Sequence, residues 1–428
     1  MIELKRFEFD IAPTWHDPRK LQASDHVKQP DHCEFLESDL TMLSTLAIAN
    51  YRSLRNFVVP LGRLNVITGP NGSGKSSVYR ALRLLAETSQ GAVIPALARE
   101  GGLQSTLWAG PEEISRSMRQ GTQAIQGTRR KEPVSLRLGF ASDTLGYLID
   151  LGLPPPVPST AFRLDPQIKR ECIWTGPFLR RAAQFVDRQG ALVKIKSPDG
   201  DWQVVDAGIA SYDSMLMQLA DPRNAPEILQ LREKVRSWRF YDHFRTDADS
   251  PARIPQVGTH TPVLSNDGHD LAAAIQTILE IGNPDRLADA VEDAFPGATL
   301  DVANIDGRFD LNMQQYGLLR PMRMAELSDG TLRYLLWIAA LLTPRPPELL
   351  VLNEPETSLH PDLLPALGRL IARAAQKSQV IVVSHASRLI ASLDEEDCNR
   401  ISLEKDCGET RVVGMSDLGQ PPWHWATR

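Results

Sequence analysis

The sequence has little cysteine for its length. Its 428 residues contain four cysteines, Cys33, Cys172, Cys398 and Cys407, and no two of them form a C-x-x-C pair. Such sparse cysteines are typical of reduced thiols rather than of a disulfide framework. The cysteine usage therefore predicts a cytoplasmic protein.

Long apolar runs and an excess of positive charge are also missing. The longest unbroken apolar run is 335–342, far below the ~20 residues that a membrane-spanning helix needs. The first residues, MIELKRFEFD, carry charges where a signal peptide needs an apolar stretch. The 47 Lys and Arg against 53 Asp and Glu give a net charge of −6, which excludes a globally basic nucleic-acid-coating protein but not a local basic face. We expect no membrane partner.

Apolar residues make up 42% of the chain and charged residues 23%, which excludes a wholly disordered chain, and no internal repeat or sustained heptad pattern is present. Residues 1–41 are interrupted by prolines and predict a separate extension, either flexible or preceding a natural start at Met42. The extension holds four residues able to bind zinc, in a spacing that fits no common finger: His16, His26, His32 and Cys33. Beyond it we expect a lobe at 42–110, a β-rich and helical middle region at 111–315, and a second lobe at 316–428.

Hydrophobic periodicity predicts an α/β fold with a largely parallel sheet, because strands alternate with helices in both lobes. The expected strands are 63–68, 134–140, 145–153, a hairpin of 191–196 with 202–207, strands within 298–315, 349–352 and 379–383. The expected helices are 76–86, 226–238, 270–281, 284–295, 330–343, 362–376 and a short one after 383.

A glycine-rich segment between the strand at 63–68 and the helix at 76–86 matches G-x-x-x-x-G-K-[ST] at every position. Its glycines let backbone N–H groups turn inward toward phosphate oxygens, and the helix start presents its positive end to the same anion. Lys75 would add a charge near the β- and γ-phosphates, and Ser76 a hydroxyl to Mg²⁺. The candidate nucleotide-binding residues are Gly69, Pro70, Asn71, Gly72, Ser73, Gly74, Lys75, Ser76 and Ser77. The alternative is a glycine-rich turn with an exposed lysine.

The strand at 349–352 ends in polar residues, as the metal-binding strand of P-loop proteins does. Glu354 is the candidate base for the attacking water, with a helix-start carboxylate as the alternative. Asn353 occupies the place of the usual aspartate and brings no negative charge, whereas Mg²⁺ prefers charged oxygen ligands. We therefore expect weak metal binding and slow turnover.

Two further segments complete the candidate site. Ser328 and Gly330 precede a long apolar helix, where they suit a second γ-phosphate contact or a plain N-cap. His385 ends another apolar strand and is the candidate γ-phosphate sensor, although a structural histidine is the commoner case.

In their order, these elements resemble the ABC-type ATPase heads of the RecF, SMC and OLD group, and above all the stand-alone bacterial P-loop (AAA-type) ATPases related to RecF. The likeness covers about residues 43–110 and 316–395. It rests on ANYRSL at 49–54, GPNGSGKS at 69–76, LSDGT at 327–331, NEPETSLH at 353–360 and SH at 384–385.

The resemblance implies roles for several residues. Arg52 and Ser53 would approach the nucleotide, and Gln104 is the best candidate for the glutamine that contacts the metal. Ser328 would complete the site of a second subunit, so that two ATP molecules are sandwiched in an ATP-dependent homodimer.

The stretch 232–245 combines basic residues with interleaved aromatic side chains, as DNA binding requires. The alternative is an amphipathic helix end with buried rings and solvated arginines. The sequence thus favours a slow ATPase coupled to a DNA-linked task such as repair or defence against foreign DNA. A nucleotide-gated scaffold that recruits a protein effector with little hydrolysis stays open, and Asn353 favours it.

Overall fold

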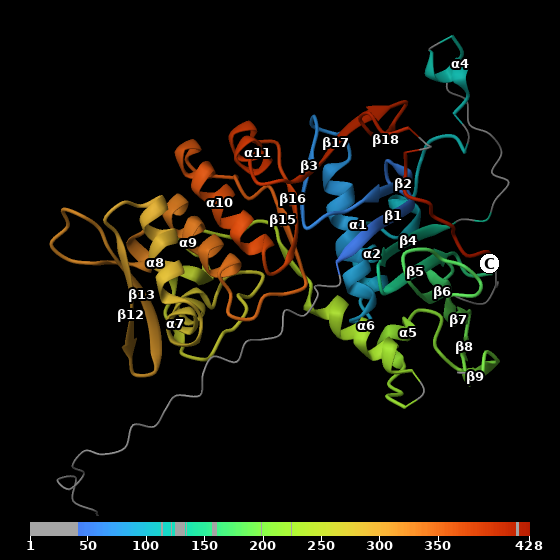
Figure 1. Cartoon of the computed structure of the whole chain (residues 1–428), viewed down its shortest axis with the longest axis horizontal. Helices are drawn as coiled ribbons and strands as arrows, with labels where there is room; N and C mark the ends of the chain where they lie inside the picture. Colours follow the sequence, from blue (N-terminus) through green and yellow to red (C-terminus); the bar gives the residue numbers. More distant parts are fainter. Residues whose placement is uncertain are drawn as a thin grey trace, which may run out of the picture. The chain divides into compact units, whose positions relative to one another are not determined.

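The computed structural model describes residues 42–112, 114–120, 122–124, 133, 135–155, 161–197, 199–223, 225–416 and 419–428 (Figure 1). The expectations for residues 1–41, including the four candidate zinc ligands, lie outside the described residues. Within the described part of the chain, no helix combines the length and apolar character needed to cross a membrane. Cys172 and Cys398 are free thiols.

A six-stranded sheet forms the centre of the described chain and has the order β10-β15-β16-β3-β17-β18. Neighbouring strands from β10 to β17 run parallel, and β18 is antiparallel to β17. The strands are β3 (Leu64–Thr68), β10 (Arg239–Tyr241), β15 (Leu349–Asn353), β16 (Gln379–Val383), β17 (Asn399–Asp406) and β18 (Glu409–Val412). The predicted parallel sheet is confirmed, whereas β10, β17 and β18 were not predicted.

Both faces of this sheet are buried, which is why its strands are continuous apolar runs. Ile67 and Val351 face a core that includes α1 (Lys75–Thr88) and a large antiparallel sheet. Val66 and Leu352, their neighbours in sequence, face a second core. The helices of that second core are α7 (Leu271–Ile281), α8 (Pro284–Ala294), α9 (Asp329–Leu341), α10 (Leu364–Ala375) and α11 (Ser387–Asp394). The predicted helices of both lobes are confirmed.

The antiparallel sheet has eight strands in the order β2-β1-β4-β5-β6-β7-β8-β9. These are β1 (Leu43–Tyr51), β2 (Leu54–Pro60), β4 (Leu136–Ser142), β5 (Leu145–Gly152), β6 (Gln167–Thr175), β7 (Gln184–Gln189), β8 (Leu192–Lys196) and β9 (Trp202–Asp206). The hairpin predicted from 191–207 is confirmed as β8 and β9. Because β1 pairs with β4, strands from both sides of residue 110 share one sheet.

The remaining elements are a third sheet and the other helices. A third sheet has the order β11-β13-β12, with β14 paired to β13. Its strands are β11 (Gln256–Val257), β12 (Thr299–Ile305), β13 (Arg308–Gln314) and β14 (Met322–Arg323). The other helices are α2 (Val93–Arg99), α3 (Leu103–Thr106), α4 (Arg116–Arg119), α5 (Met215–Gln218), α6 (Pro226–Ser237), η1 (Pro251–Arg253), η2 (Met324–Glu326) and η3 (Pro361–Leu363).

The fold gathers the candidate site at one edge of the parallel sheet. Parallel strands end at the same edge, so the residues that follow β3, β10, β15 and β16 lie near one another. Figure 1 shows β3, β15 and β16 side by side, with α1 on one side and α10 on the other.

Candidate nucleotide-binding site

The glycine-rich loop, residues 69–76, leaves β3 and enters α1. Gly69 and Gly74 have φ angles of 149° and 111°, which L side chains rarely adopt. A Cβ on Gly69 would overlap the carbonyl oxygen of Leu403, and one on Gly74 would overlap the hydroxyl of Thr410. Glycine is therefore required by both conformation and space where the loop presses against β17 and β18.

Lys75 is held inside the curl of the loop. Its Nζ donates to the carbonyl oxygens of Gly69 at 2.6 Å and Pro70 at 3.1 Å. The hydroxyl of Ser73 is buried in the same loop and has no partner among the described residues. A buried polar atom without a partner is costly, and a phosphate oxygen would satisfy this hydroxyl. The loop therefore fits an anionic ligand.

A groove of about 390 Å³ opens over this loop. Its lining comes from four separate parts of the chain: Arg52, Ser53, Asn71, Gly72, Gly74, Lys75, Ser76, Ser77, Glu354 and Lys405. The structure thus brings Arg52, Ser53 and Glu354 to the loop, as the sequence motifs led us to expect. Lys405 was not anticipated, since a single lysine on a strand carries no motif.

Two contacts hold the β1–β2 turn against the groove. Arg52 adopts φ 51° and its guanidinium pairs with Glu100 at 2.6 Å. The hydroxyl of Thr410 lies 2.7 Å from both the Ser53 hydroxyl and the Ser73 carbonyl oxygen. Thr410 therefore fixes Ser53 to the loop, a role with no local sequence signal.

Glu354 lies where β15 ends, in a left-handed conformation with φ 48°. Its backbone N–H donates to the carbonyl oxygen of Val383 at 2.8 Å, which ties it to the end of β16. The Glu354 side chain is 41% exposed, and one of its oxygens lies 3.8 Å from Nδ1 of His385. The structure thus places the candidate base and the candidate sensor together, with the carboxylate open to the groove.

Glu356 organises this corner and was missed from the sequence. Its Oε1 accepts from the Ser384 hydroxyl at 2.8 Å and from the backbone N–H groups of His385 at 3.0 Å and Ala386 at 3.2 Å. Nδ1 of His385 is 3.3 Å from the same oxygen. The buried carboxylate therefore fixes the backbone that carries the histidine.

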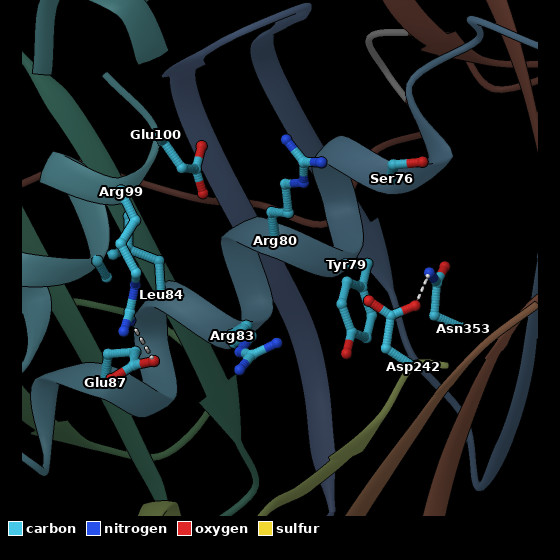
Figure 2. Close-up of a pocket in the computed structure, with 11 residues that line it drawn as sticks. Ser76, Tyr79, Arg80, Arg83, Leu84, Glu87, Arg99, Glu100, Asp242 and Asn353 are labelled. Carbon is cyan, nitrogen blue, oxygen red and sulfur yellow. Dashed lines mark hydrogen bonds and ion pairs between the residues drawn. The ribbon is translucent and has the colours of Figure 1, made fainter. Parts of the chain in front are cut away.

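Asn353 is the last residue of β15, and its amide faces Asp242, the first residue after β10 (Figure 2). Nδ2 of Asn353 donates to Oδ1 of Asp242 at 2.7 Å. Both residues line a second groove of about 440 Å³, together with Ser76 and the charged side chains of α1. Asp242 belongs to the stretch that the sequence had suggested for DNA binding, so its place beside Asn353 was not foreseen.

Ser328 and Gly330 do not line either groove. The Ser328 hydroxyl caps α9 by accepting from the Thr331 N–H at 3.1 Å and is exposed. Arg253, another unforeseen residue, holds this segment: its guanidinium donates to the Leu327 carbonyl at 2.7 Å and pairs with Asp329 at 2.7 Å.

Gln104 lies exposed on α3 and lines neither groove. The structure therefore does not bring this candidate metal ligand to the phosphate loop. Glu100, at the end of the preceding helix, does line the second groove.

The stretch 232–245 is not a stacking surface for nucleic-acid bases, which corrects that expectation. Its four aromatic rings are buried in the two cores: Trp238, Phe240, Tyr241 and Phe244. Its cations are also engaged, since Lys234 pairs with Glu348 and Arg239 donates to three backbone carbonyls. The stretch includes the end of α6 and the strand β10. Its buried rings match the alternative of an amphipathic helix end.

Two family models and one curated relative match parts of this chain. Residues 195–391 match the family described as "AAA domain, putative AbiEii toxin, Type IV TA system", and residues 42–140 match "AAA ATPase domain". An OLD nuclease of Thermus scotoductus (strain ATCC 700910 / SA-01) is 46% identical over 44 residues. That match spans 10% of this chain and 8% of the curated relative's length.

Solved SMC heads are similar at low identity. A head bound to the C-winged helix domain of ScpA has 14% identity and a TM-score of 0.47, covering 88% of this chain and 98% of that chain. The SMC head domain from Thermotoga maritima has 14% identity and a TM-score of 0.41, covering 87% and 99%.

Proposed function

We propose that this chain, an ABC-type P-loop ATPase of the group related to OLD and SMC proteins, binds ATP with Mg²⁺ and hydrolyses it slowly in the groove over residues 69–76. The observation that carries the proposal is the convergence on one groove of three separate segments: the β1–β2 turn with Arg52 and Ser53, the loop with Ser76, and Glu354 after β15. The unpartnered buried hydroxyl of Ser73 supports an anionic ligand there.

Each group in the groove has a distinct task under this proposal. Backbone N–H groups of the loop and the start of α1 bind the phosphates, and Lys75 leaves its two carbonyl partners to meet the β/γ-phosphate charge. Ser76 and the end of β15 would hold Mg²⁺, which neutralises the developing charge when it is bound. Glu354 orients or deprotonates the attacking water. His385 contacts the γ-phosphate, and Glu356 fixes its backbone.

The same proposal includes an ATP-dependent homodimer. Ser328 is exposed at the start of α9 and does not line the groove of its own chain. It is therefore available to a nucleotide held by a second copy. A cap at a helix start is well suited to an anion because the first N–H groups and the helix dipole point outward.

We assign the ATPase to a DNA-linked task, such as repair or defence against foreign DNA. The support is the segment shared with an OLD nuclease, a protein whose name denotes nucleic-acid cleavage. The second candidate is a nucleotide-gated scaffold for a protein effector, and the neutral Asn353 favours it because weak metal binding slows hydrolysis. Phosphate release measured with and without DNA separates the two: stimulation by DNA supports the first, and ATP binding without turnover supports the second.

Lys75→Ala tests the site itself. Loss of the ammonium removes the side-chain charge nearest the phosphates, so ATP affinity should fall by at least tenfold in a fluorescent-nucleotide titration. Lys377→Ala, which removes an exposed lysine at the end of α10, is the matched control and should bind like the wild type. Equal ATP affinity in Lys75→Ala and the control would remove the site from residues 69–76.

A further inference from the structure

We propose that Asp242 supplies the metal-site carboxylate that Asn353 lacks, so that the two residues act as one negatively charged ligand pair for the nucleotide-bound Mg²⁺. The inference rests on the proposed nucleotide site and identifies the residues that serve its metal. It concerns Asp242 as a charge-bearing ligand residue, reaching the metal directly or through a bound water.

The first observation is the pairing of β10 with β15. The two strands are parallel, and Tyr241 lies opposite Leu352 in their register. The next residues along the two strands are Asp242, just after β10, and Asn353, the last residue of β15, side by side at the carboxyl edge of the sheet. This edge is the one that Ser76 also faces, since all three residues line the same groove.

The second observation is the state of the Asn353 amide. Its Nδ2 is committed to Asp242 at 2.7 Å, and its Oδ1 is buried with no partner among the described residues. The amide can donate to a carboxylate, but it brings no charge of its own. The pair as a whole carries one negative charge, as a single aspartate at position 353 would.

The third observation is that Asp242 is exposed and makes no ion pair within the described part of the chain. Two cationic side chains of α1, Arg80 and Arg83, line the same groove, as the close-up shows (Figure 2). The pKa of Tyr79 is raised to about 12, first by burial and then by the negative charge of Asp242. A carboxylate held open to the groove, with its charge uncompensated by a bonded arginine, suits a hard cation such as Mg²⁺.

A purely structural role for Asp242, as a tie between two strands, makes a different prediction. Asp242→Asn keeps an acceptor oxygen for the Asn353 N–H and removes only the charge. The tie would survive this change, whereas the metal ligand would not.

The test measures nucleotide affinity and needs no turnover. Full-length protein is titrated with a fluorescent non-hydrolysable ATP analogue in excess Mg²⁺ and again in EDTA. The Kd in EDTA divided by the Kd in Mg²⁺ is the ratio that reports the metal's contribution to affinity. Asp242→Asn should lower this ratio by about tenfold, the effect typical of losing an orienting group at a metal site. The EDTA arm should stay within about threefold of the wild type. Asp249→Asn, an exposed carboxylate further along the same loop, is the control for lost charge and should leave the ratio unchanged.

The exchanged double variant, Asp242→Asn with Asn353→Asp, carries the test further. It keeps one amide, one carboxylate and the hydrogen bond, so the ratio should return to within about threefold of the wild type. It also serves if Asp242→Asn does not fold. An unchanged ratio in Asp242→Asn, a wild-type ratio near one, or a folded exchanged variant with no metal response overturns the inference. Failure of the wild type to bind the analogue in either arm instead overturns the proposed nucleotide site.

Discussion

Replacing Asn353 by aspartate places two carboxylates where the protein has an amide and a carboxylate. Asn353→Asp removes the N–H that Asp242 accepts at 2.7 Å and sets two negatively charged oxygens against each other. A hydrogen bond to a charged group contributes about 1.5–3 kcal/mol. Two unit charges about 4 Å apart repel by about 1 kcal/mol in water and about 4 kcal/mol near a protein surface. Since Asp242 is exposed, the lower value applies to the repulsion, and together the two effects come to about 2.5–4 kcal/mol.

Without nucleotide, Asn353→Asp should therefore lower the Tm by roughly 5–8 °C, taking about 2 °C per kcal/mol for a large domain. Addition of Mg²⁺ with a non-hydrolysable ATP analogue should recover most of this loss, because the cation neutralises the facing carboxylates. The Mg²⁺ concentration for half-maximal ATPase activity should fall below that of the wild type.

Thermal unfolding with and without Mg²⁺ and the analogue measures both effects. Asn283→Asp is the matched control, since Asn283 caps α8 by accepting from a backbone N–H and aspartate can do the same. A variant at Asn353 as stable as the wild type without metal would refute the repulsion. A loss of stability that Mg²⁺ leaves untouched would show that no cation reaches the pair, and a higher Mg²⁺ requirement would mean the site is adapted to the amide.

Two further changes test the remaining parts of the proposal. Glu354→Gln should bind ATP without completing turnover and should therefore accumulate as a dimer, which sedimentation at micromolar protein with ATP and Mg²⁺ detects. Adding Ser328→Arg should abolish that dimer. Monomer in both variants would argue against the sandwiched dimer. Joint replacement of Arg232, Arg236 and Arg239 by glutamine should lower the Tm, because Arg236 and Arg239 donate to backbone carbonyls. The salt dependence of any DNA binding should stay unchanged. A flatter salt dependence would show that this stretch contacts nucleic acid.

The phosphate loop could be predicted because all of its information is local. Residues 69–76 form a contiguous pattern between a strand and a helix, and each glycine meets a steric demand within a few residues. The parallel sheet could be predicted for a similar reason, since strands buried on both faces consist of consecutive apolar residues. The same local reasoning located Glu354 and His385, each just after such a strand.

The partner of Asn353 could not be predicted, because hydrophobic periodicity indicates where strands lie in the sequence but not which strands are neighbours in the sheet. Asp242 lies 111 residues from Asn353 in sequence, and β10 has only three residues. Its aromatic residues read as a nucleic-acid surface, although the fold uses them to fill two cores. Pairing of β1 with β4 across residue 110 was hidden for the same reason. The pairing of strands that are distant in sequence determines which charged side chains lie together, and this pairing cannot be inferred from a single sequence.

The buried guanidinium of Arg333 links the segment after β10, which carries the proposed metal ligand Asp242, to the start of α9, which a second subunit would contact in the proposed dimer. Arg333, on α9, donates to the Thr357 carbonyl at 2.7 Å, to the Phe244 carbonyl at 2.9 Å and to the Thr246 hydroxyl at 3.1 Å. Burial lowers the pKa of Arg333, and the negative charge of Asp329 opposes this shift. No carboxylate forms an ion pair with the guanidinium among the described residues, so these three acceptors carry its hydrogen bonds.

These acceptors lie in the two segments that carry the proposed metal ligand and the proposed base. Phe244 and Thr246 follow Asp242, and Thr357 follows Glu354, while Arg333 itself lies one turn after Ser328. Leaving a buried donor unpaired costs about 1–3 kcal/mol, and more for a charged group. A displacement of the 242–246 segment on metal binding must therefore move α9 and the 354–357 segment with it, or else break these bonds. The proposed metal site and the exposed start of α9 are thus linked by hydrogen bonds within one chain, which is a property that the proposed ATP-controlled dimer requires.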